Sequence, residues 1–196
     1  MSGWLTPGMP LISFFTGQER FYADTNNTQG INPESGAIAP SILAALSLFY
    51  GNFSSKTTVA GSRYFSSLTF GTPVTVTGIN VLIGSVGGTD TWLVEIHDST
   101  GALVATSSTS GVTAGTAGTW QQIALTAPIT LAAGTYFVAL QTNGTTAHPA
   151  VYNFPAPSAA PYPLLVGSAT GTFGTGASIT PPTTYAAALG PVVLPY

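Results

Sequence analysis

The side chains that could perform acid–base or metal chemistry are few, and most of them lie in one stretch of the chain. Glu95 and His97 belong to the run Trp-Leu-Val-Glu-Ile-His, which alternates toward its end like a β-strand. Alternation places both side chains on the same face of that strand, about 7 Å apart. The remaining candidates are Asp90, Asp98 and His148. Any catalytic or metal site would have to draw on this small set.

The pattern around these residues argues against a reaction centre. A metal site needs about three or four converging ligands, and no ligand-spacing motif occurs. The chain has no cysteine, which excludes disulfides and thiolate metal sites. It has no Gly-x-Ser-x-Gly elbow, and its two histidines offer few general bases. We therefore expect no enzyme activity, no metal and no cofactor, with Glu95 and His97 on a solvated or interface-facing strand.

Three aromatic residues could stack on sugar rings if they gather on one surface. They are Trp92, Trp120 and Tyr152. Tryptophan and tyrosine are as common in cores and subunit interfaces as in ligand sites. A core or interface role is therefore the favoured interpretation, and sugar binding is kept as the alternative.

The elements that must position these residues are predicted to be short strands separated by turns. Alternating apolar residues predict strands within 57–70, 74–83, 92–97, 103–107, 120–126 and 134–141. Asp98-Ser99-Thr100-Gly101 predicts a tight turn, because Asp bonds its downstream backbone and Gly tolerates positive φ. Gly78 predicts a β-bulge, because the apolar positions change there from even to odd numbers. This spacing predicts an all-β fold, an antiparallel β-sandwich of the jelly-roll type.

Composition divides the chain near residue 52. Residues 1–52 hold three of the six acidic residues and four prolines that interrupt any long element. Residues 41–49 are rich in Ala and Leu and predict a short helix. We expect 1–52 to be an irregular N-terminal arm for attachment and oligomerisation, and 53–196 to be the β-sandwich domain. From residue 151 this domain is rich in Pro and Gly, and it ends in a predicted closing strand at 192–194.

Charge is the outlier of the composition. Charged residues make up 5% of the chain, against about 25% in an ordinary globular domain. Arg63 is the last basic residue, so nucleic-acid binding through phosphate neutralisation is not expected. The most apolar run, 38–50, contains Pro40 and is too short to span a bilayer, and the first residues lack the basic region of a signal peptide. A surface so poor in charge indicates extensive contact with partner proteins.

Several segments resemble a β-sandwich domain found in virion proteins of tailed bacteriophages. The most characteristic is Val94-Glu95-Ile96-His97-Asp98-Ser99-Thr100-Gly101. The others are 88–90, 102–105, 114–121, 134–140, 143–146, 171–174, 179–183 and 190–191. Near the N-terminus, Phe-Thr-Gly-Gln-Glu and the residues after it resemble a segment that recurs in phage capsid-associated and fibre proteins. The residues that carry this second likeness are Phe15, Thr16, Gly17, Glu19, Asp24, Thr25, Gln29, Gly30 and Pro33.

The resemblance implies a structural protein on the virion surface, made in the host cytoplasm. It would be a capsid decoration (cement) protein or a head fibre, and the nine N-terminal residues would contact the capsid. Its partners would be capsid or other virion proteins and further copies of itself, with a trimer expected by analogy with phage fibres. The alternative is a glycan-binding adhesion module of a phage tail or fibre that uses Trp92, Trp120 and Tyr152.

Overall fold

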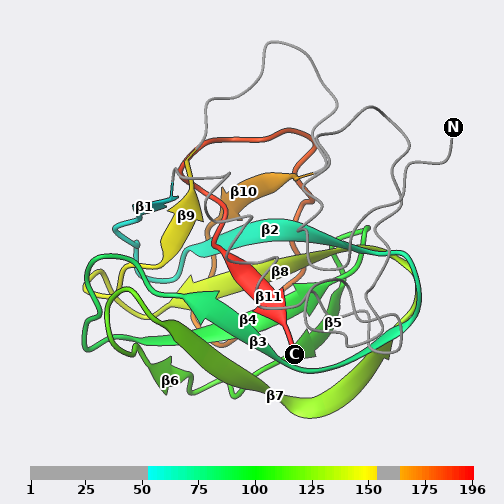
Figure 1. Ribbon diagram of the computed structural model, residues 1–196, viewed down its shortest axis with the longest axis horizontal. Coiled ribbons are helices and arrows are strands. Elements are labelled where there is room, and N and C mark those ends of the chain that lie inside the picture. The colour runs from blue at the N-terminus through cyan, green and yellow to red at the C-terminus, as the bar shows by residue number, and fades with distance from the viewer. Residues whose placement is uncertain (1–52, 154–163) are drawn as a thin grey trace, which may run out of the picture. The chain divides into compact units, whose positions relative to one another are not determined.

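The computed structural model describes residues 53–153 and 164–196, and the regular structure of this part is entirely β (Figure 1). Its strands are β1 (Phe53–Ser55), β2 (Arg63–Phe70), β3 (Val74–Leu82), β4 (Thr91–His97), β5 (Leu103–Thr106), β6 (Val112–Thr113), β7 (Trp120–Leu131), β8 (Gly134–Thr142), β9 (Ala150–Tyr152), β10 (Val166–Ala169) and β11 (Val193–Pro195). No helix in these two ranges is long and apolar enough to cross a membrane.

Every described residue belongs to one compact unit, Ala45–Tyr196. The predicted arm at 1–52, its short helix and the nine candidate capsid-contact residues lie outside the described residues.

The strands form three antiparallel sheets. One sheet has the order β10-β2-β8-β4-β5, with β6 also paired to β4. A second has the order β11-β3-β7, and β1 pairs with β9 in a third. Every strand pairing is antiparallel. The predicted all-β antiparallel sandwich is therefore confirmed.

The core lies between the six-stranded sheet and the three-stranded sheet. Trp92, Val94 and Ile96 of β4 point into it with alternate residues of β8, and β3 and β7 supply the opposite side. The β3 side chains in this core are Val76, followed by Ile79 and Val81. The register of β3 against β7 shifts between Val76 and Gly78, so the bulge predicted at Gly78 is confirmed. Between the pairs made by Val76 and Gly78, one residue of β3, Thr77, faces four residues of β7, and this odd offset lets β3 keep apolar side chains in the core on both sides of Gly78.

The other face of the six-stranded sheet is also buried. Phe65, Phe137 and Ala139 form a second apolar cluster there with Ile179 of the C-terminal segment. This segment follows β10, and the Ile179 amide donates a hydrogen bond to the Gly101 carbonyl oxygen at 2.9 Å. As a result, six consecutive residues of β4, Trp92 to His97, are buried regardless of the face on which they lie.

The turn predicted at Asp98 forms as expected and joins β4 to β5. The Asp98 carboxylate accepts hydrogen bonds from the backbone amides of Thr100 and Ala102, at 2.8 and 3.0 Å. Gly101 completes the turn with a φ of 88°, which favours glycine. A side-chain carbon at Gly101 would also collide with the carbonyl oxygen of Ile179. Gly101 is therefore required both by the turn and by the segment packed on it.

Replacing Gly101 by Ala should destabilise the domain by more than the cost of positive φ alone, which is about 1–2 kcal/mol. The matched control is Gly118→Ala, because Gly118 has a φ of 70° and no atom within 4 Å of an added carbon. Urea unfolding of both variants would measure the difference. Equal losses at the two positions would show that the approach of Ile179 to Gly101 has no energetic weight.

Candidate functional site

Glu95 and His97 meet Arg63 in a buried charged cluster on the face of the six-stranded sheet that the C-terminal segment covers. Arg63 Nε lies 2.9 Å from Glu95 Oε2, and His97 Nε2 lies 3.3 Å from the same oxygen. The three side chains are at most 2% exposed. Arg63 comes from β2 and the other two from β4, and these strands flank β8. We refer to Arg63, Glu95 and His97 as the charged triad.

Polar groups of the C-terminal segment complete the surroundings of the triad. Arg63 Nη2 donates to the Thr175 hydroxyl at 3.2 Å, and a carbon added at Gly171 would collide with the guanidinium. Gln141 of β8 donates to the Gly61 carbonyl at 2.8 Å and accepts from the Gly174 amide at 3.0 Å. The segment is thus attached to the sheet by hydrogen bonds as well as by the apolar cluster at Ile179.

The imidazole of His97 faces an acceptor on each side. Nδ1 lies 3.2 Å from the Gly101 carbonyl oxygen, which can only accept, and Nε2 lies beside the Glu95 carboxylate. A hydrogen on Nδ1 can be donated to the Gly101 carbonyl, and a hydrogen on Nε2 can be donated to the Glu95 carboxylate. The second carboxylate oxygen, Glu95 Oε1, is buried and has no hydrogen-bond partner among the described residues.

The triad is closed to a substrate. Glu95 and His97 share a face, as predicted, but both are 0% exposed. The expectation that they lie on a solvated or interface-facing strand is wrong, because the C-terminal segment covers them. In this arrangement the triad can hold the sheet and the segment together, and it cannot reach a ligand at the surface.

The other candidate acid–base residues lie apart from the triad. Within 53–153 and 164–196, no three His, Asp or Glu side chains come together as metal ligands. Desolvation is the largest single influence on Asp90 and raises its pKa, but hydrogen bonds from Thr146 and Ala147 and the nearby His148 leave the pKa below its ordinary value. The pKa of Asp98 is also lowered, first by the hydrogen bond from the Thr100 hydroxyl and then by backbone amides. Asp90 therefore binds the loop at Thr146 and Ala147, and Asp98 stabilises the turn that it begins.

The predicted sugar-stacking residues have separate positions. Trp92 is 0% exposed in the core and donates its indole N–H to Gln121 at 2.9 Å, so its proposed stacking role is wrong. Trp120 is 41% exposed at the start of β7. Tyr152 lies on β9, with its ring edge-on to Phe53 at 5.6 Å between ring centres.

A surface groove of about 320 Å³ lies near Trp120 and Tyr152. Its lining is Phe53, Ser54, Ser55, Leu82, Ile83, Gly84, Ser85, Gly118 and Ala150, and we call it the β1–β3 groove. Leu82 is directly opposite Trp120 in the β3–β7 register, so their side chains lie on the same face of the sheet. Phe53, which contacts Tyr152, forms the other side. Sequence analysis missed the serines and Phe53, because no local pattern predicts the pairing of β1 with β9.

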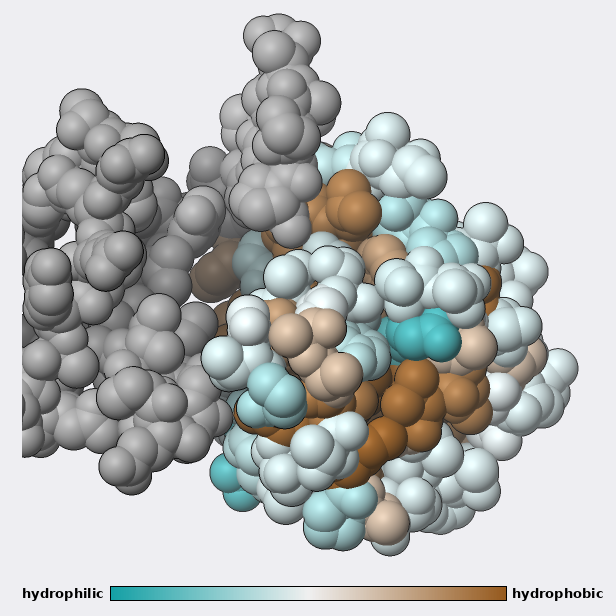
Figure 2. All heavy atoms as spheres, turned by 90° about the vertical axis from the view of Figure 1, so that its right-hand side faces the viewer, coloured by the Kyte–Doolittle hydropathy of each residue, from teal (hydrophilic) through white to brown (hydrophobic). Residues whose placement is uncertain are grey.

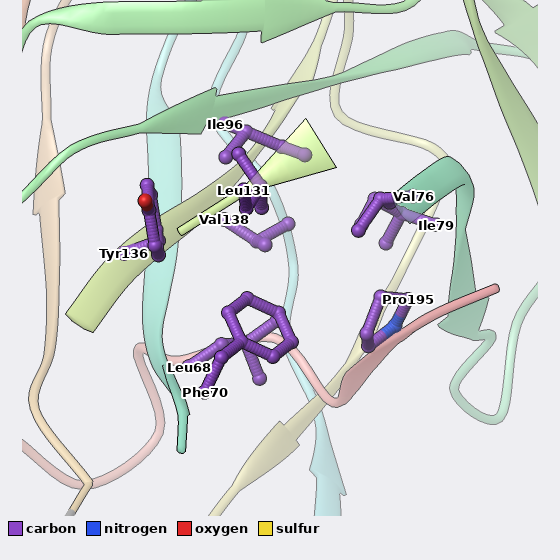
Figure 3. Close-up of a pocket in the computed structure, with 9 residues that line it drawn as sticks. All are labelled: Leu68, Phe70, Val76, Ile79, Ile96, Leu131, Tyr136, Val138 and Pro195. Atoms are coloured by element: carbon purple, nitrogen blue, oxygen red, sulfur yellow. The ribbon is translucent and has the colours of Figure 1, made fainter. Parts of the chain in front are cut away.

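A second hollow lies at one end of the sandwich core and is entirely apolar. Its lining side chains converge from both large sheets (Figure 3), and they are Leu68, Phe70, Val76, Ile79, Ile96, Leu131, Tyr136, Val138 and Pro195. It has no room for even a water-sized molecule. This hollow is therefore part of the core packing, and the β1–β3 groove is the candidate ligand site.

Removing one member of the triad should be costly, because the partner charge stays buried. We expect Arg63→Met to lower the free energy of unfolding by about 3–5 kcal/mol. The double variant Arg63→Met/Glu95→Gln should lose less than the sum of the single changes, because neither charge is then left unpaired. Thr69→Val, at an exposed position of the same strand, is the control. Strict additivity in urea unfolding would contradict a coupled triad.

The lowered pKa of Asp98 predicts a loss of stability in acid. A carboxyl group whose pKa is lower in the folded chain stabilises it above the ordinary value of 3.8, and this contribution disappears as the pH falls through the lower folded value. Asp98→Asn should therefore make the unfolding free energy less dependent on pH in the acidic range. Ser99→Ala, in the same turn, should keep the dependence of the parent chain. Identical pH profiles for Asp98→Asn and the parent would refute this assignment.

A family model described as a domain of unknown function, DUF4082, matches residues 67–188. No curated protein and no solved structure matches the chain. The matched range runs from within β2 to beyond β10, and it contains Glu95, His97 and most of the segment that covers them. Because the match spans more than half of its residues, this chain belongs to the DUF4082 family.

Proposed function

We propose that this chain is a structural protein of a tailed-phage virion that decorates the capsid exterior, as a cement protein or a head fibre. The observation that carries the proposal is how the β-domain uses its charged residues. The described ranges contain five of them, Lys56, Arg63, Asp90, Glu95 and Asp98. Arg63 and Glu95 are buried together, and both aspartates accept backbone amides. The Lys56 ammonium lies 5.8 Å from the centre of the Tyr64 ring.

Because few charged groups remain exposed, the surface of the described domain is weakly polar. Figure 2 shows one face, on which pale residues of intermediate hydropathy surround apolar patches and strongly hydrophilic residues are rare. Soluble monomers ordinarily keep apart through interspersed surface charge. A surface of hydroxyl, amide and apolar groups instead suits lasting contact with neighbouring subunits, because few charges must be desolvated when it is covered. This supports an assembled protein over a freely diffusing one.

The sequence resemblance supplies the kind of assembly. The segments that resemble phage virion β-sandwiches include the last four residues of β4, the Asp98 turn and most of β8. We propose capsid or other virion proteins as partners, and a homo-oligomer, a trimer by analogy with phage fibres. In this proposal residues 1–52 form the attachment arm, with the nine residues from Phe15 to Pro33 at the capsid contact.

Deletion of residues 1–52 tests the attachment role. The remaining chain should keep its β-rich circular dichroism and cooperative unfolding, because the charged triad and both apolar clusters lie after residue 52. It should no longer join phage heads in an incorporation assay, and light scattering should show loss of the oligomer. The matched control is the full chain with Val104→Ala, an exposed position on β5. Normal incorporation of the truncated chain would refute the arm.

A further inference from the structure

We infer that the β1–β3 groove binds a sugar ring of a neutral saccharide. This inference stands apart from the virion role, because it rests on the lining of the groove and on the exposed Trp120 beside it. The groove is about 320 Å³ in volume, at the lower end of the usual range of small-molecule sites, about 300–1,000 Å³.

The floor of the groove is formed where two sheets continue into each other. The Leu82 amide of β3 donates to the Val192 carbonyl at 3.0 Å, and the Val192 amide donates to the Ala150 carbonyl of β9 at 2.9 Å. Residues 190–192 thus join the three-stranded sheet to the β1–β9 pair. Leu82 and Ala150, on either side of this joint, contribute apolar groups to the lining.

One side of the groove is rigidly held. The Ser55 hydroxyl donates a hydrogen bond to the Ser85 hydroxyl at 2.8 Å and accepts a hydrogen bond from the Ser85 backbone amide. A carbon added at Gly84 would collide with Ser55, so β1 lies directly on this glycine. A site held in place before binding loses little entropy when a ligand enters it.

An exposed indole lies beside the groove, on the same face of the sheet as Leu82. Trp120 is 41% exposed, lies across from Leu82 and is two residues from Gly118, which lines the groove. The C–H face of a sugar ring can pack on such an indole while the sugar hydroxyls stay at the edges. Phe53 contributes an aromatic ring to the lining itself.

The polar groups of the groove fit an uncharged ligand with many hydroxyls. Ser54, Ser55 and Ser85 contribute hydroxyls to the lining, of which the Ser55 hydroxyl already donates its hydrogen to Ser85 and can offer a ligand only an acceptor. None of the described residues that line the groove is ionisable. A charged ligand would lose its hydration here without gaining an opposite charge, whereas a neutral sugar exchanges water for hydroxyl partners. The chemistry of the lining therefore selects a neutral saccharide.

Titration of the full chain with neutral hexasaccharides tests the inference. The probes are maltohexaose, cellohexaose and hexa-N-acetylchitohexaose. Binding is measured by calorimetry and by changes in the indole N–H signals in NMR spectra. At least one probe should bind and shift the Trp120 signal, while the buried Trp92 signal, held by Gln121, should stay in place. Absence of any heat and of any Trp120 shift at millimolar concentrations would overturn the inference. Tighter binding of an anionic oligogalacturonate would also overturn it.

Two variants locate the binding. Trp120→Ala should weaken it by about tenfold, the equivalent of one aromatic contact. Gly118→Asn should weaken it by adding a side chain at the rim, where no atom lies within 4 Å and where asparagine tolerates the positive φ. Val104→Ala, on β5, should bind like the parent chain. Unchanged affinity in both groove variants, with their unfolding transitions intact, would place the sugar elsewhere and refute the site.

Discussion

The buried charged triad is the constraint on which the rest of the domain depends. Removing two charges from water is expensive, and their attraction offsets that cost only when geometry and extra hydrogen bonds are good. Here the guanidinium of Arg63 needs Glu95 on β4 and Thr175 in the C-terminal segment at the same time. The imidazole of His97 contacts the Gly101 carbonyl oxygen of the Asp98 turn, and the same oxygen accepts a hydrogen bond from the Ile179 amide. Strand, turn and covering segment therefore have to be in place together.

The same constraint explains how much of the fold could be predicted from the sequence. Alternation is a local property, so the strands around Val94 and Ile96, the bulge at Gly78 and the Asp98 turn could all be predicted correctly. Burial of the second sheet face is not local. Arg63 lies 32 residues before Glu95, and Thr175 lies 112 residues after Arg63, with no periodic pattern to connect them. Local reasoning could therefore place Glu95 on the correct face but in the wrong environment.

The aromatic residues show the same limit at the candidate site. Trp92 and Trp120 each lie at the start of a strand, yet one is in the core and the other is at the surface. What separates them is the face on which each side chain lies, and this depends on strand pairing between distant segments. The groove beside Trp120 likewise depends on β1 meeting β9, almost a hundred residues later. The domain buries Arg63 and Glu95 and engages both aspartates in backbone hydrogen bonds, so its surface offers mainly aromatic rings and hydroxyls for recognition.

The strand order also has a consequence for folding. β3 has β7 on one side, but its other side is completed only by β11, the last strand, and β2 similarly requires β8 and β10. These pairings join segments far apart in the chain, and such topologies close slowly, on the order of milliseconds to seconds. During synthesis on the ribosome, neither large sheet can complete its ladder until the C-terminal strands have emerged. The nascent domain must remain incomplete until β11, Val193–Pro195, has been translated.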